Sequence, residues 1–369
     1  MSSSSPVRVL HVIDSFDLGG AQTALRHLIR ATDRTRFAPE VAAMHGRGVF
    51  YEDFRALGVP VHSLSPRRWL PLYVPALAAL ILQRRPRIVH CHLFGSNWIA
   101  KPLAALLGVQ VRISHDQCND ALRYESRAAR WLDTMTNRLS THVCAVSRST
   151  RDFLLTQEGL PPDRVSVVFN GVDLERFDPQ RATVTRDAAH PLIAGVGRLH
   201  PQKDFSLFLE VAARLAQRNP AIRFVIAGDG PEAAALRQKA AALGLTDRVR
   251  FAGHVADMRE IYASADALLL TSRYEGTPLT LLEAMAMRVP VIASRLDGIA
   301  EVLTDGGDGF LVAHGDVKGF AERVATLLGD PALRARMAEA ARQKVEAAFS
   351  ASAMAAAVEA IYARCLSDL

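Results

Sequence analysis

Hydrophobic positions in the first half of the chain fall into short apolar runs separated by segments with helical spacing. The helical spacing covers residues 22–31, 97–107 and 121–139. Unbroken apolar runs are typical of strands buried on both faces, and here they predict strands at 7–13, 88–92, 109–114, 142–146 and 165–169. Strands that alternate with helices indicate a parallel sheet covered on both sides.

A second series of the same kind begins at residue 192. Residues 173–190 lack clear periodicity and are predicted to be a linker, whereas 317–369 are mostly Ala-, Arg- and Glu-rich helix. The apolar runs of this half predict strands at 192–196, 223–227, 249–251, 267–270 and 289–293. The chain is therefore predicted to be an α/β protein whose two doubly wound domains face each other across a cleft. We expect domains at 1–175 and 176–350, with a C-terminal helix at 351–369 packing back on the first domain.

Length and composition agree with this organisation. A chain of 369 residues favours two domains, and 49% hydrophobic with 22% charged residues is typical of a soluble globular protein. The four cysteines are scattered without a Cys-x-x-Cys pair, which favours a reduced, cytoplasmic chain over a disulfide framework or a zinc module. Residues 1–6 lack the long apolar region of a signal peptide.

The net charge of +6 lies entirely in the first half, where residues 1–180 hold 22 Lys and Arg against 16 Asp and Glu. Such a surplus indicates either an anionic partner or a mildly basic solvated surface, and charge alone favours the latter. The apolar run 69–82 has two arginines on each side, yet it is too short to span a bilayer. A packed helix with basic ends is favoured over a helix lying on a membrane surface.

Two carboxylates stand out in the second half, Glu275 in a Gly-Thr-Pro turn and Glu283 within an apolar helix. Pro278 suits the first position of that helix, so the free N–H groups of the helix start are expected beside Glu275. A helix N-terminus attracts phosphate. A carboxylate beside a phosphate site suits a ligand that is anionic at one end and rich in hydroxyls at the other, as a nucleotide-sugar is.

Arg198 and Lys203 follow the strand predicted at 192–196 and precede a helix. A guanidinium and an ammonium so placed can neutralise a diphosphate. The chain contains no Asp-x-Asp pair of the kind that holds a divalent ion, so these cations and helix N-termini would carry the charge without a metal. Gly19 and Gly20 precede the first predicted helix, where glycines let a ligand approach the backbone, although such pairs are usually simple turns.

The histidines offer two further candidates. His90 and His92 alternate on a predicted strand and can share a face, but no Asp or third His lies at ligand spacing, so a polar pair is favoured over a metal site. His115 follows the apolar run 109–114, which places an imidazole at the expected cleft for proton transfer or hydrogen bonding.

Taken in order, these features resemble the retaining glycosyltransferases of the GT-B fold, the group 1 or family 4 transferases. The resemblance covers nearly the whole chain. It also includes Ser147 after the strand at 142–146, the Asn170-Gly171-Val172-Asp173 junction, and the loops Gly228-Asp229-Gly230-Pro231 and Gly253-His254-Val255.

The resemblance implies a role for each candidate. Glu275 would bind hydroxyls of the donor sugar and Glu283 those of the ribose, while Arg198 and Lys203 would hold the diphosphate. His115 would lie near the transferred sugar and assist the acceptor side. The remaining donor contacts would come from Gly19 and Gly20, from the N–H groups of Leu279 and Thr280, and from the backbone around Val255, which would hold the base.

The expected activity is a metal-independent, retaining transfer of sugar from a nucleoside-diphosphate donor to a glycan or lipid-linked acceptor, with no separate cofactor. We expect a cytoplasmic protein, with contact to an anionic membrane as a possible addition and no nucleic-acid partner. Two alternatives stay open, namely a nucleotide-sugar epimerase of the same fold and a catalytically silent subunit that only binds nucleotide-sugar.

Overall fold

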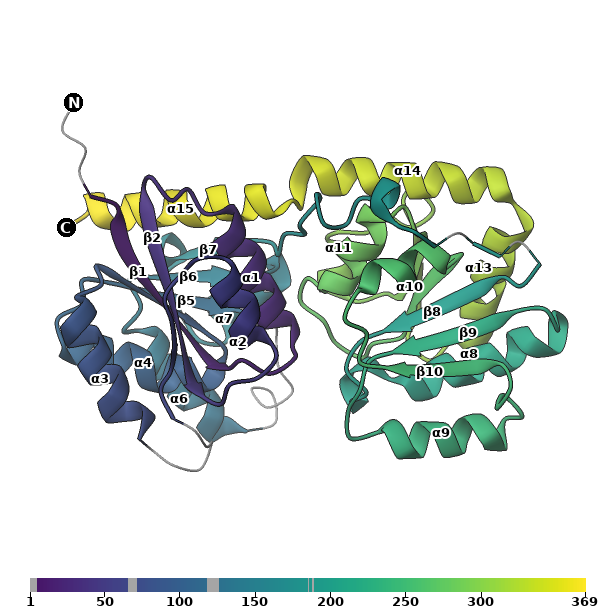
Figure 1. The fold of residues 1–369 in the computed structure, drawn as a ribbon, viewed down its shortest axis with the longest axis horizontal. Helices are drawn as coiled ribbons and strands as arrows, with labels where there is room; N and C mark the ends of the chain where they lie inside the picture. The colour runs from purple at the N-terminus through teal and green to yellow at the C-terminus, as the bar shows by residue number, and fades with distance from the viewer. Residues whose placement is uncertain (1–4, 66–71, 118–125, 185, 188) are drawn as a thin grey trace. The chain divides into compact units, whose positions relative to one another are not determined.

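The computed structural model describes residues 5–65, 72–117, 126–184, 186–187 and 189–369. The chain forms two compact units (Figure 1). Unit 1 consists of Met1–Gly171 together with Ala351–Leu369, and unit 2 is Val172–Ser350. The predicted domain boundary at 175 lies four residues beyond the end of the first segment of unit 1.

Within the described residues, unit 1 is built on a parallel sheet of seven strands. Their order places β1 between β2 and β4, so the chain winds outward from β1 in both directions. Across the sheet the strands are β3 (Val61–Ser63), β2 (Phe37–His45), β1 (Val7–Ser15), β4 (Ile88–His92), β5 (Val111–Asp116), β6 (His142–Ala145) and β7 (Val165–Val167).

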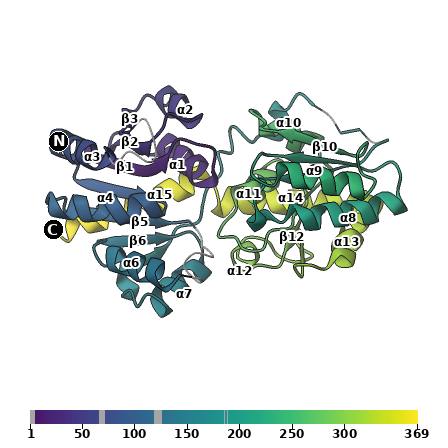
Figure 2. The same cartoon turned by 90° about the horizontal axis from the view of Figure 1, so that it is seen from below.

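Helices cover both faces of this sheet. On one face α1 (Gly20–Ala31), α2 (Phe50–Ala56) and α15 (Ala351–Ser367) enclose an apolar core that includes Ile13, Ile88 and Ile113. On the other face lie α3 (Tyr73–Arg84) and α4 (Phe94–Leu106), with α6 (Arg127–Asn137) against α4 and α7 (Arg148–Thr156) beside β6 and β7 (Figure 2). Side chains that alternate along each strand therefore enter two separate cores.

Unit 2 repeats this plan with a parallel sheet of six strands among its described residues. Here β8 lies between β9 and β11, and the chain again winds outward from the first strand of the unit. Across the sheet the strands are β10 (Val249–Gly253), β9 (Arg223–Ala227), β8 (Leu192–Val196), β11 (Ala267–Leu270), β12 (Val291–Ser294) and β13 (Phe310–Val312).

Helices α8 (Phe205–Arg218), α9 (Ala233–Ala242) and α13 (Val317–Gly329) bury their apolar sides against one face of the unit 2 sheet. Figure 1 shows α10 (Met258–Ser264) and α11 (Leu279–Ala286) on the opposite side. The long α14 (Pro331–Ala348) packs against α11 and α13, and α12 (Asp297–Ala300) follows β12. The two parallel-sheet units confirm the predicted α/β fold class.

Three strands escaped prediction, one because polar residues interrupt its apolar run and two because they are very short. The sequence of β2 contains Pro39 and Glu40, which interrupt an apolar run. Glu40 is nevertheless buried, because Arg84 donates to it at 2.7 Å and His62 lies 3.4 Å from it. The edge strands β3 and β13 have only three residues each, too few for a periodic signal.

The run predicted at 69–82 is helical from Tyr73, and its first residues lie outside the described part of the chain. Leu77, Leu80 and Ile81 pack into the core of unit 1, whereas Leu82 on the outer side is 59% exposed. The helix thus has one packed face and one partly apolar exposed face. No helix in the described residues is both long and apolar enough to cross a membrane.

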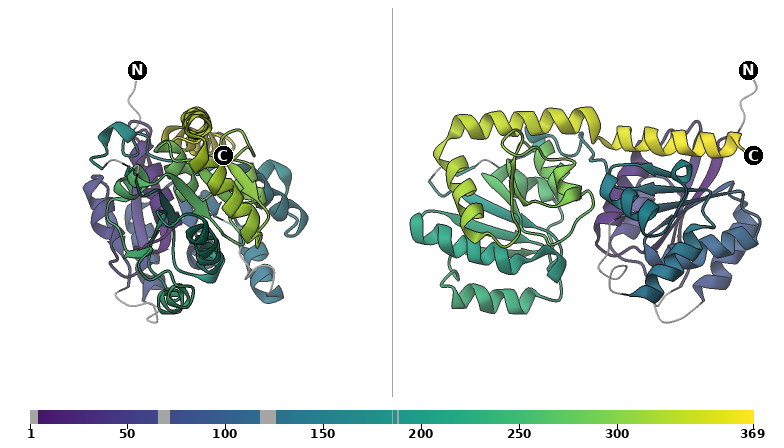
Figure 3. Two further views of the ribbon diagram at one scale, coloured as in Figure 1. Left: turned by 90° about the vertical axis from the view of Figure 1, so that its right-hand side faces the viewer. Right: turned by 180° about the vertical axis from the view of Figure 1, so that it is seen from behind.

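Residues 351–369 form α15 and the last turn of the chain, and they belong to unit 1. Met354, Val358 and Ile361 enter the same core as α1 and β1. The carboxylate of Glu359 accepts a hydrogen bond from the Asp33 N–H at 2.8 Å. Figure 3 shows this helix, in yellow, along unit 1 from behind.

Candidate active site

The candidate donor-binding residues of unit 2 gather at the carboxyl ends of β8 and β11. These two strands are adjacent, and the order of strands in the sheet reverses between them. Open parallel sheets bind ligands at such a switch point, where the loops after the two strands separate. Arg198 and Lys203 lie on the loop after β8, and Glu275 lies on the loop after β11.

Glycines allow the neighbouring loops to approach closely. A Cβ atom on Gly228, which has φ of +143°, would lie 1.9 Å from the carbonyl oxygen of Gly197. A Cβ on Gly298 would lie 2.1 Å from the carbonyl oxygen of Gly276. The loop after β8 therefore rests against the loop after β9, and the Glu275–Gly276 turn rests against the start of α12. Any side chain at these positions would displace the candidate site.

Lys203 and Glu275 form an ion pair, with 2.5 Å between Nζ and Oε1. The Ser272 hydroxyl donates to the same carboxylate oxygen at 2.6 Å. The side chain of Lys203 is 18% exposed and that of Glu275 is 7% exposed, so the ion pair is largely shielded from solvent. The ammonium group carries three N–H donors, so Lys203 can hold Glu275 and still donate to a ligand. The proposed diphosphate and sugar ligands thus share one electrostatic unit.

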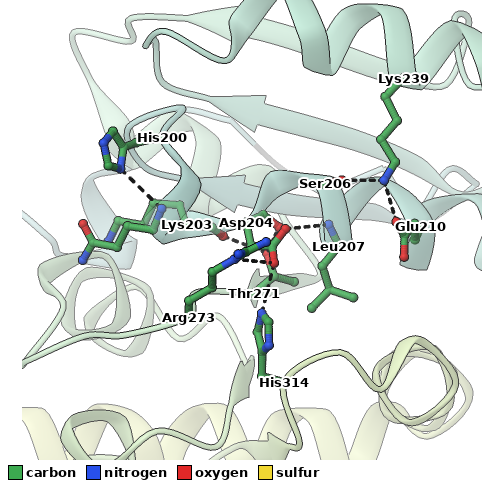
Figure 4. Close-up of polar contacts among 11 residues, drawn as sticks. His200, Lys203, Asp204, Ser206, Leu207, Glu210, Lys239, Thr271, Arg273 and His314 are labelled. Atoms are coloured by element: carbon green, nitrogen blue, oxygen red, sulfur yellow. Dashed lines mark hydrogen bonds and ion pairs between the residues drawn. The ribbon is translucent and has the colours of Figure 1, made fainter. Parts of the chain in front are cut away.

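Asp204 fixes the backbone that carries Lys203 (Figure 4). Asp204 has φ of +45°, a left-handed conformation that costs energy for a residue with a side chain. Its carboxylate accepts hydrogen bonds from Arg273 at 3.0 Å and from the Leu207 N–H at 3.2 Å, and it lies 3.0 Å from His314 Nε2. The Thr271 hydroxyl also donates to the Lys203 and Asp204 carbonyls. Contacts from three segments therefore hold the loop after β8 in its strained form.

Arg198 is exposed at the start of the same loop, and its guanidinium makes no hydrogen bond or ion pair with any described residue. The adjacent Leu199 is buried, and its N–H donates to the Asp229 carbonyl at 2.9 Å. The backbone at this corner is therefore fixed while the cation remains available. Five N–H donors in a planar group suit the bidentate recognition of a phosphate.

The helix after Glu275 begins one residue later than predicted. Pro278 is the N-cap, with φ −71° and ψ 125°, and α11 starts at Leu279. Pro278 was expected at the first helical position, but its extended ψ excludes it from the helix. The first N–H groups of a helix have no acceptor within it, so those of Leu279 and Thr280 can meet an anion. The Thr280 hydroxyl is buried and has no hydrogen-bond partner among the described residues.

Glu283 lies one turn further along α11 and is buried. Burial raises the pKa of its carboxyl to about 7, although the hydrogen bond from the Tyr262 hydroxyl and the charge of Arg176 act in the opposite direction. That hydrogen bond is 2.8 Å long. A carboxyl near its pKa at neutral pH can accept hydrogen bonds from ligand hydroxyls when ionised. Tyr262 was not predicted, because a lone buried tyrosine gives no sequence signal.

Val255 lies between β10 and α10 and is half-buried. The preceding Gly253 has φ of +64° and ends β10, so the backbone turns sharply there. Backbone N–H and C=O groups in such a turn can form hydrogen bonds with a nucleotide base. The role of Val255 in binding the base stays a prediction.

In unit 1, Gly19 is the N-cap of α1, and Gly20 is its first residue. Gly20 is exposed, and a Cβ atom built on it meets nothing within 4 Å. A Cβ on Gly19 would lie 2.4 Å from Oε1 of Gln22, whose amide in turn donates to the Ser15 carbonyl at 3.1 Å. A side chain at position 19 would therefore displace the end of Gln22, whereas Gly20 gives open access to the backbone.

His115 was expected beyond the end of a strand, but it lies within β5, which continues to Asp116. Its side chain is buried, and neither ring nitrogen has a partner among the described residues. Burial lowers the pKa of His115 to about 4, so the imidazole is neutral near pH 7. The ring stacks on His90 with 5.4 Å between centroids. In this structure His115 belongs to a buried group of histidines.

No third histidine lies at ligand spacing from His90 and His92 in the sequence, but the fold brings His11 beside them. His11 on β1 pairs in register with His90 on the neighbouring β4, and its Nδ1 lies 3.1 Å from Nε2 of His92. Sequence spacing hid this neighbour because β1 and β4 are adjacent in the sheet but separated by β2 and β3 along the chain.

Comparison with known proteins agrees with this arrangement. The family model described as "Glycosyl transferases group 1" matches residues 177–344, and that of "Glycosyltransferase Family 4" matches residues 18–176. The putative glycosyltransferase EpsF of Bacillus subtilis is 30% identical over 333 residues, which cover 82% of this chain and 83% of EpsF. The D-inositol 3-phosphate glycosyltransferase of Frankia alni is 32% identical over 82% of this chain and 81% of that protein.

Among solved structures, Anabaena HepE in complex with UDP-glucose is similar, with a TM-score of 0.84 and 21% identity over 98% of this chain and 100% of HepE. Sucrose-phosphate synthase of Thermosynechococcus elongatus has a TM-score of 0.83 at 18% identity, over 98% of this chain and 100% of that structure. These likenesses establish the two-domain GT-B fold. The length covered in EpsF and the paired family matches show that the chain belongs to the group 1 glycosyltransferases and is a glycosyltransferase.

Proposed function

We propose that the protein transfers a sugar, with retention of anomeric configuration and without a metal ion, from a nucleoside-diphosphate-sugar to a glycan or lipid-linked acceptor. The observation that carries this proposal is the ion pair of Lys203 with Glu275 at the carboxyl edge of β8 and β11, on the same loop as Arg198, which has no side-chain partner among the described residues. Lys203 pairs with the carboxylate there, and Arg198 adds a second cation on the loop after β8. The arrangement suits a ligand with a diphosphate at one end and sugar hydroxyls at the other.

When the bond between sugar and diphosphate breaks, negative charge grows on the departing phosphate oxygen. Arg198, Lys203 and the N–H groups of Leu279 and Thr280 would stabilise that charge, because preorganised donors act most strongly where charge develops. Glu275 would orient the sugar through its hydroxyls, and Glu283 would bind the ribose. The departing phosphate would take the acceptor proton in a front-face attack, so no enzymic nucleophile is required.

Two features support catalysis of sugar transfer without a divalent cation. The carboxylates of this site, Glu275 and Glu283, are each held by a protein donor, Lys203 and Tyr262. The cations, in turn, can supply the positive charge that a metal would otherwise bring to the diphosphate.

The nucleotide base of the donor does not follow from the site residues, and the relatives indicate which base to test first. HepE was solved with UDP and with UDP-glucose, and the relative from Escherichia coli is named a UDP-Gal-dependent galactosyltransferase. We therefore place a uridine nucleotide first among the candidate donors of this chain. For the acceptor, the relative from Rhizobium meliloti is named as a lipopolysaccharide core enzyme, which supports a glycan or lipid-linked acceptor here.

A thermal-shift panel with UDP, GDP and ADP, followed by assays with the matching sugar nucleotides, tests the proposal. A nucleotide at about a hundred times its dissociation constant stabilises the folded protein by about 2.7 kcal/mol. The expected result is a clear preference for one base, followed by release of that nucleoside diphosphate from its sugar donor. An altered sugar still attached to the nucleotide would indicate an epimerase. Binding without any release of diphosphate from a full set of donors and acceptors would indicate a silent subunit.

A further inference from the structure

Unit 1 contains a group of buried imidazoles that the proposed transfer does not use. His11, His90 and His92 project from the adjacent strands β1 and β4 into the core under α1 and α15, and all three are at most 2% exposed. One ring nitrogen from each lies within 4.8 Å of the others. An isolated polar side chain in such a core is costly, and three together require a compensating interaction.

The ring nitrogens of this trio are only partly satisfied. Nδ1 of His11 lies 3.1 Å from Nε2 of His92, and Nδ1 of His90 lies 2.5 Å from the hydroxyl of Tyr362 on α15. Nε2 of His90 and Nδ1 of His92 have no hydrogen-bond partner among the described residues. Buried nitrogens without partners are rare in folded proteins, and a bound ion is one explanation that fits Nε2 of His90.

The contact with Tyr362 matches what surrounds a metal-bound histidine. An imidazole that binds a metal through one nitrogen normally donates the N–H of the other to an oxygen, which fixes the tautomer and the ring orientation. If His90 binds through Nε2, its Nδ1–H donates to the Tyr362 hydroxyl. The 3.1 Å between His11 and His92 is also close to the spacing of about 3.3 Å between two nitrogens that each lie about 2.05 Å from one tetrahedral zinc ion.

We propose that His11, His90 and His92 form a binding site for one borderline transition-metal ion of the zinc class, located in the core of unit 1. Three imidazoles are a ligand set that zinc uses, and they disfavour magnesium and calcium, which prefer oxygen. A fourth position would be filled by water or by the neighbouring His115, whose ring centroid is 5.6 Å from that of His92. The site is separate from Arg198, Lys203 and Glu275, which belong to unit 2.

Binding requires the rings to turn. His90 and His92 stack with 4.3 Å between centroids and 26° between planes, whereas a metal must lie in the plane of each ring that binds it. Rotation about χ2 of histidine is soft, so the rings can reorient without any movement of β1 or β4. Because the site is buried, the ion would enter during folding, so the protein must be produced with the metal present.

The test uses full-length protein without a histidine tag, produced in medium supplemented with cobalt or zinc and then desalted. Metal analysis is expected to give about one ion per chain, and the cobalt form should show the visible absorption of a four-coordinate nitrogen site. His11→Asn and His92→Asn should lose the metal, whereas His142→Asn should keep it, because His142 lies on β6 and bonds to Ser166 instead. Wild-type protein without bound metal, or equal metal in all four proteins, would overturn the proposal.

Two measurements keep the test decisive if a histidine variant fails to fold. Tyr362→Phe keeps all three ligands but removes the oxygen at His90, and it should weaken the metal about 10–100-fold, while Tyr51→Phe in the same unit should not. Nitrogen-15 spectra of wild-type imidazoles, recorded with and without zinc, need no substitution. Three rings should each shift at one nitrogen, and unchanged spectra with bound zinc would place the ion elsewhere.

Discussion

The ammonium of Lys203 and the carboxylate of Glu275 lie 2.5 Å apart, although the two residues come from loops after different strands. The resemblance to known transferases assigns them to different parts of the donor, the diphosphate and the sugar. Their direct contact means that neither can be altered without affecting the other. The contact also makes Lys203 different from Arg198, which lies on the same loop but whose side chain has no partner among the described residues.

Arg198→Ala and Lys203→Ala should each reduce kcat about 10²–10³-fold, or about 3–4 kcal/mol of barrier, because each removes a charge that stabilises the departing diphosphate. Their thermal midpoints should differ. Lys203→Ala leaves the buried Glu275 without its cation and should lower the midpoint, whereas Arg198→Ala should leave it unchanged. Steady-state kinetics and calorimetric melting measure the two effects, with Arg250→Ala as a control at an exposed arginine on β10. Full activity in both variants would remove the charge clamp from the mechanism.

Glu275→Gln should impair turnover and leave the affinity for the free nucleoside diphosphate nearly intact, because its proposed partners are sugar hydroxyls. Glu283→Ala should weaken the nucleotide itself, because its proposed partner is the ribose. Titration calorimetry with the nucleoside diphosphate separates these outcomes. The opposite pattern would exchange the roles of the two carboxylates.

Nucleotide affinity should increase as the pH rises through about 7, since the ionised Glu283 accepts stronger, charge-assisted hydrogen bonds from ribose hydroxyls than the protonated carboxyl does. Affinity measured from pH 5.5 to 8.5 in wild type and in Glu283→Gln isolates this effect, because the titration of the phosphate is common to both. Tyr262→Phe removes a hydrogen bond that favours the ionised form, so the midpoint should move to higher pH. Identical pH profiles for wild type and Glu283→Gln would refute the ribose assignment.

The ionisation of Glu283 should raise nucleotide affinity but lower the stability of the folded protein. The pKa of its carboxyl is raised from 4.5 to about 7 by burial, so folding favours the protonated form. The resulting stabilisation is fully present below pH 4.5 and is lost as the pH rises through 7. The pH that favours nucleotide binding therefore lowers the free energy of unfolding of the free protein.

Transfer or donor hydrolysis should survive excess EDTA, because Arg198 and Lys203 supply the positive charge at the diphosphate. The assay should run well below the melting temperature, so that loss of an ion from the histidines of unit 1 changes stability rather than turnover. Complete loss of activity that magnesium or manganese restores would contradict the charge-clamp mechanism. Parallel melting curves distinguish that result from unfolding.

If unit 1 contacts an anionic bilayer, the protein should float with anionic liposomes at low salt and not with neutral ones. The exposed apolar side of α3 is the proposed contact, so Leu82→Gln should reduce flotation, while Leu106→Gln, at an 81% exposed leucine on α4, serves as a matched control. Absence of binding to both kinds of liposome would favour a helix that only packs. Arg84 contributes little to such contact, because it is already paired with Glu40.

The apolar runs predicted the interior strands well, because a strand buried on both faces must be apolar throughout. They missed β2, where Glu40 is buried only because Arg84 and His62 reach it from other elements. The candidate residues of unit 2 were placed correctly after strand ends, since parallel strands present their loops at one edge. Contacts between distant segments gave no such signal, and this is why Asp204, Tyr262 and the approach of His11 to His92 were not predicted.

The position of α15 in unit 1 sets an order of events during synthesis. Strands β1 and β4 leave the ribosome early, but the helix that covers His90 and contributes Met354 and Val358 to their core follows the whole of unit 2. Unit 2 is contiguous and can complete its fold first. Until α15 arrives, unit 1 presents an open apolar surface to the cell, and chaperones have their longest opportunity to bind there.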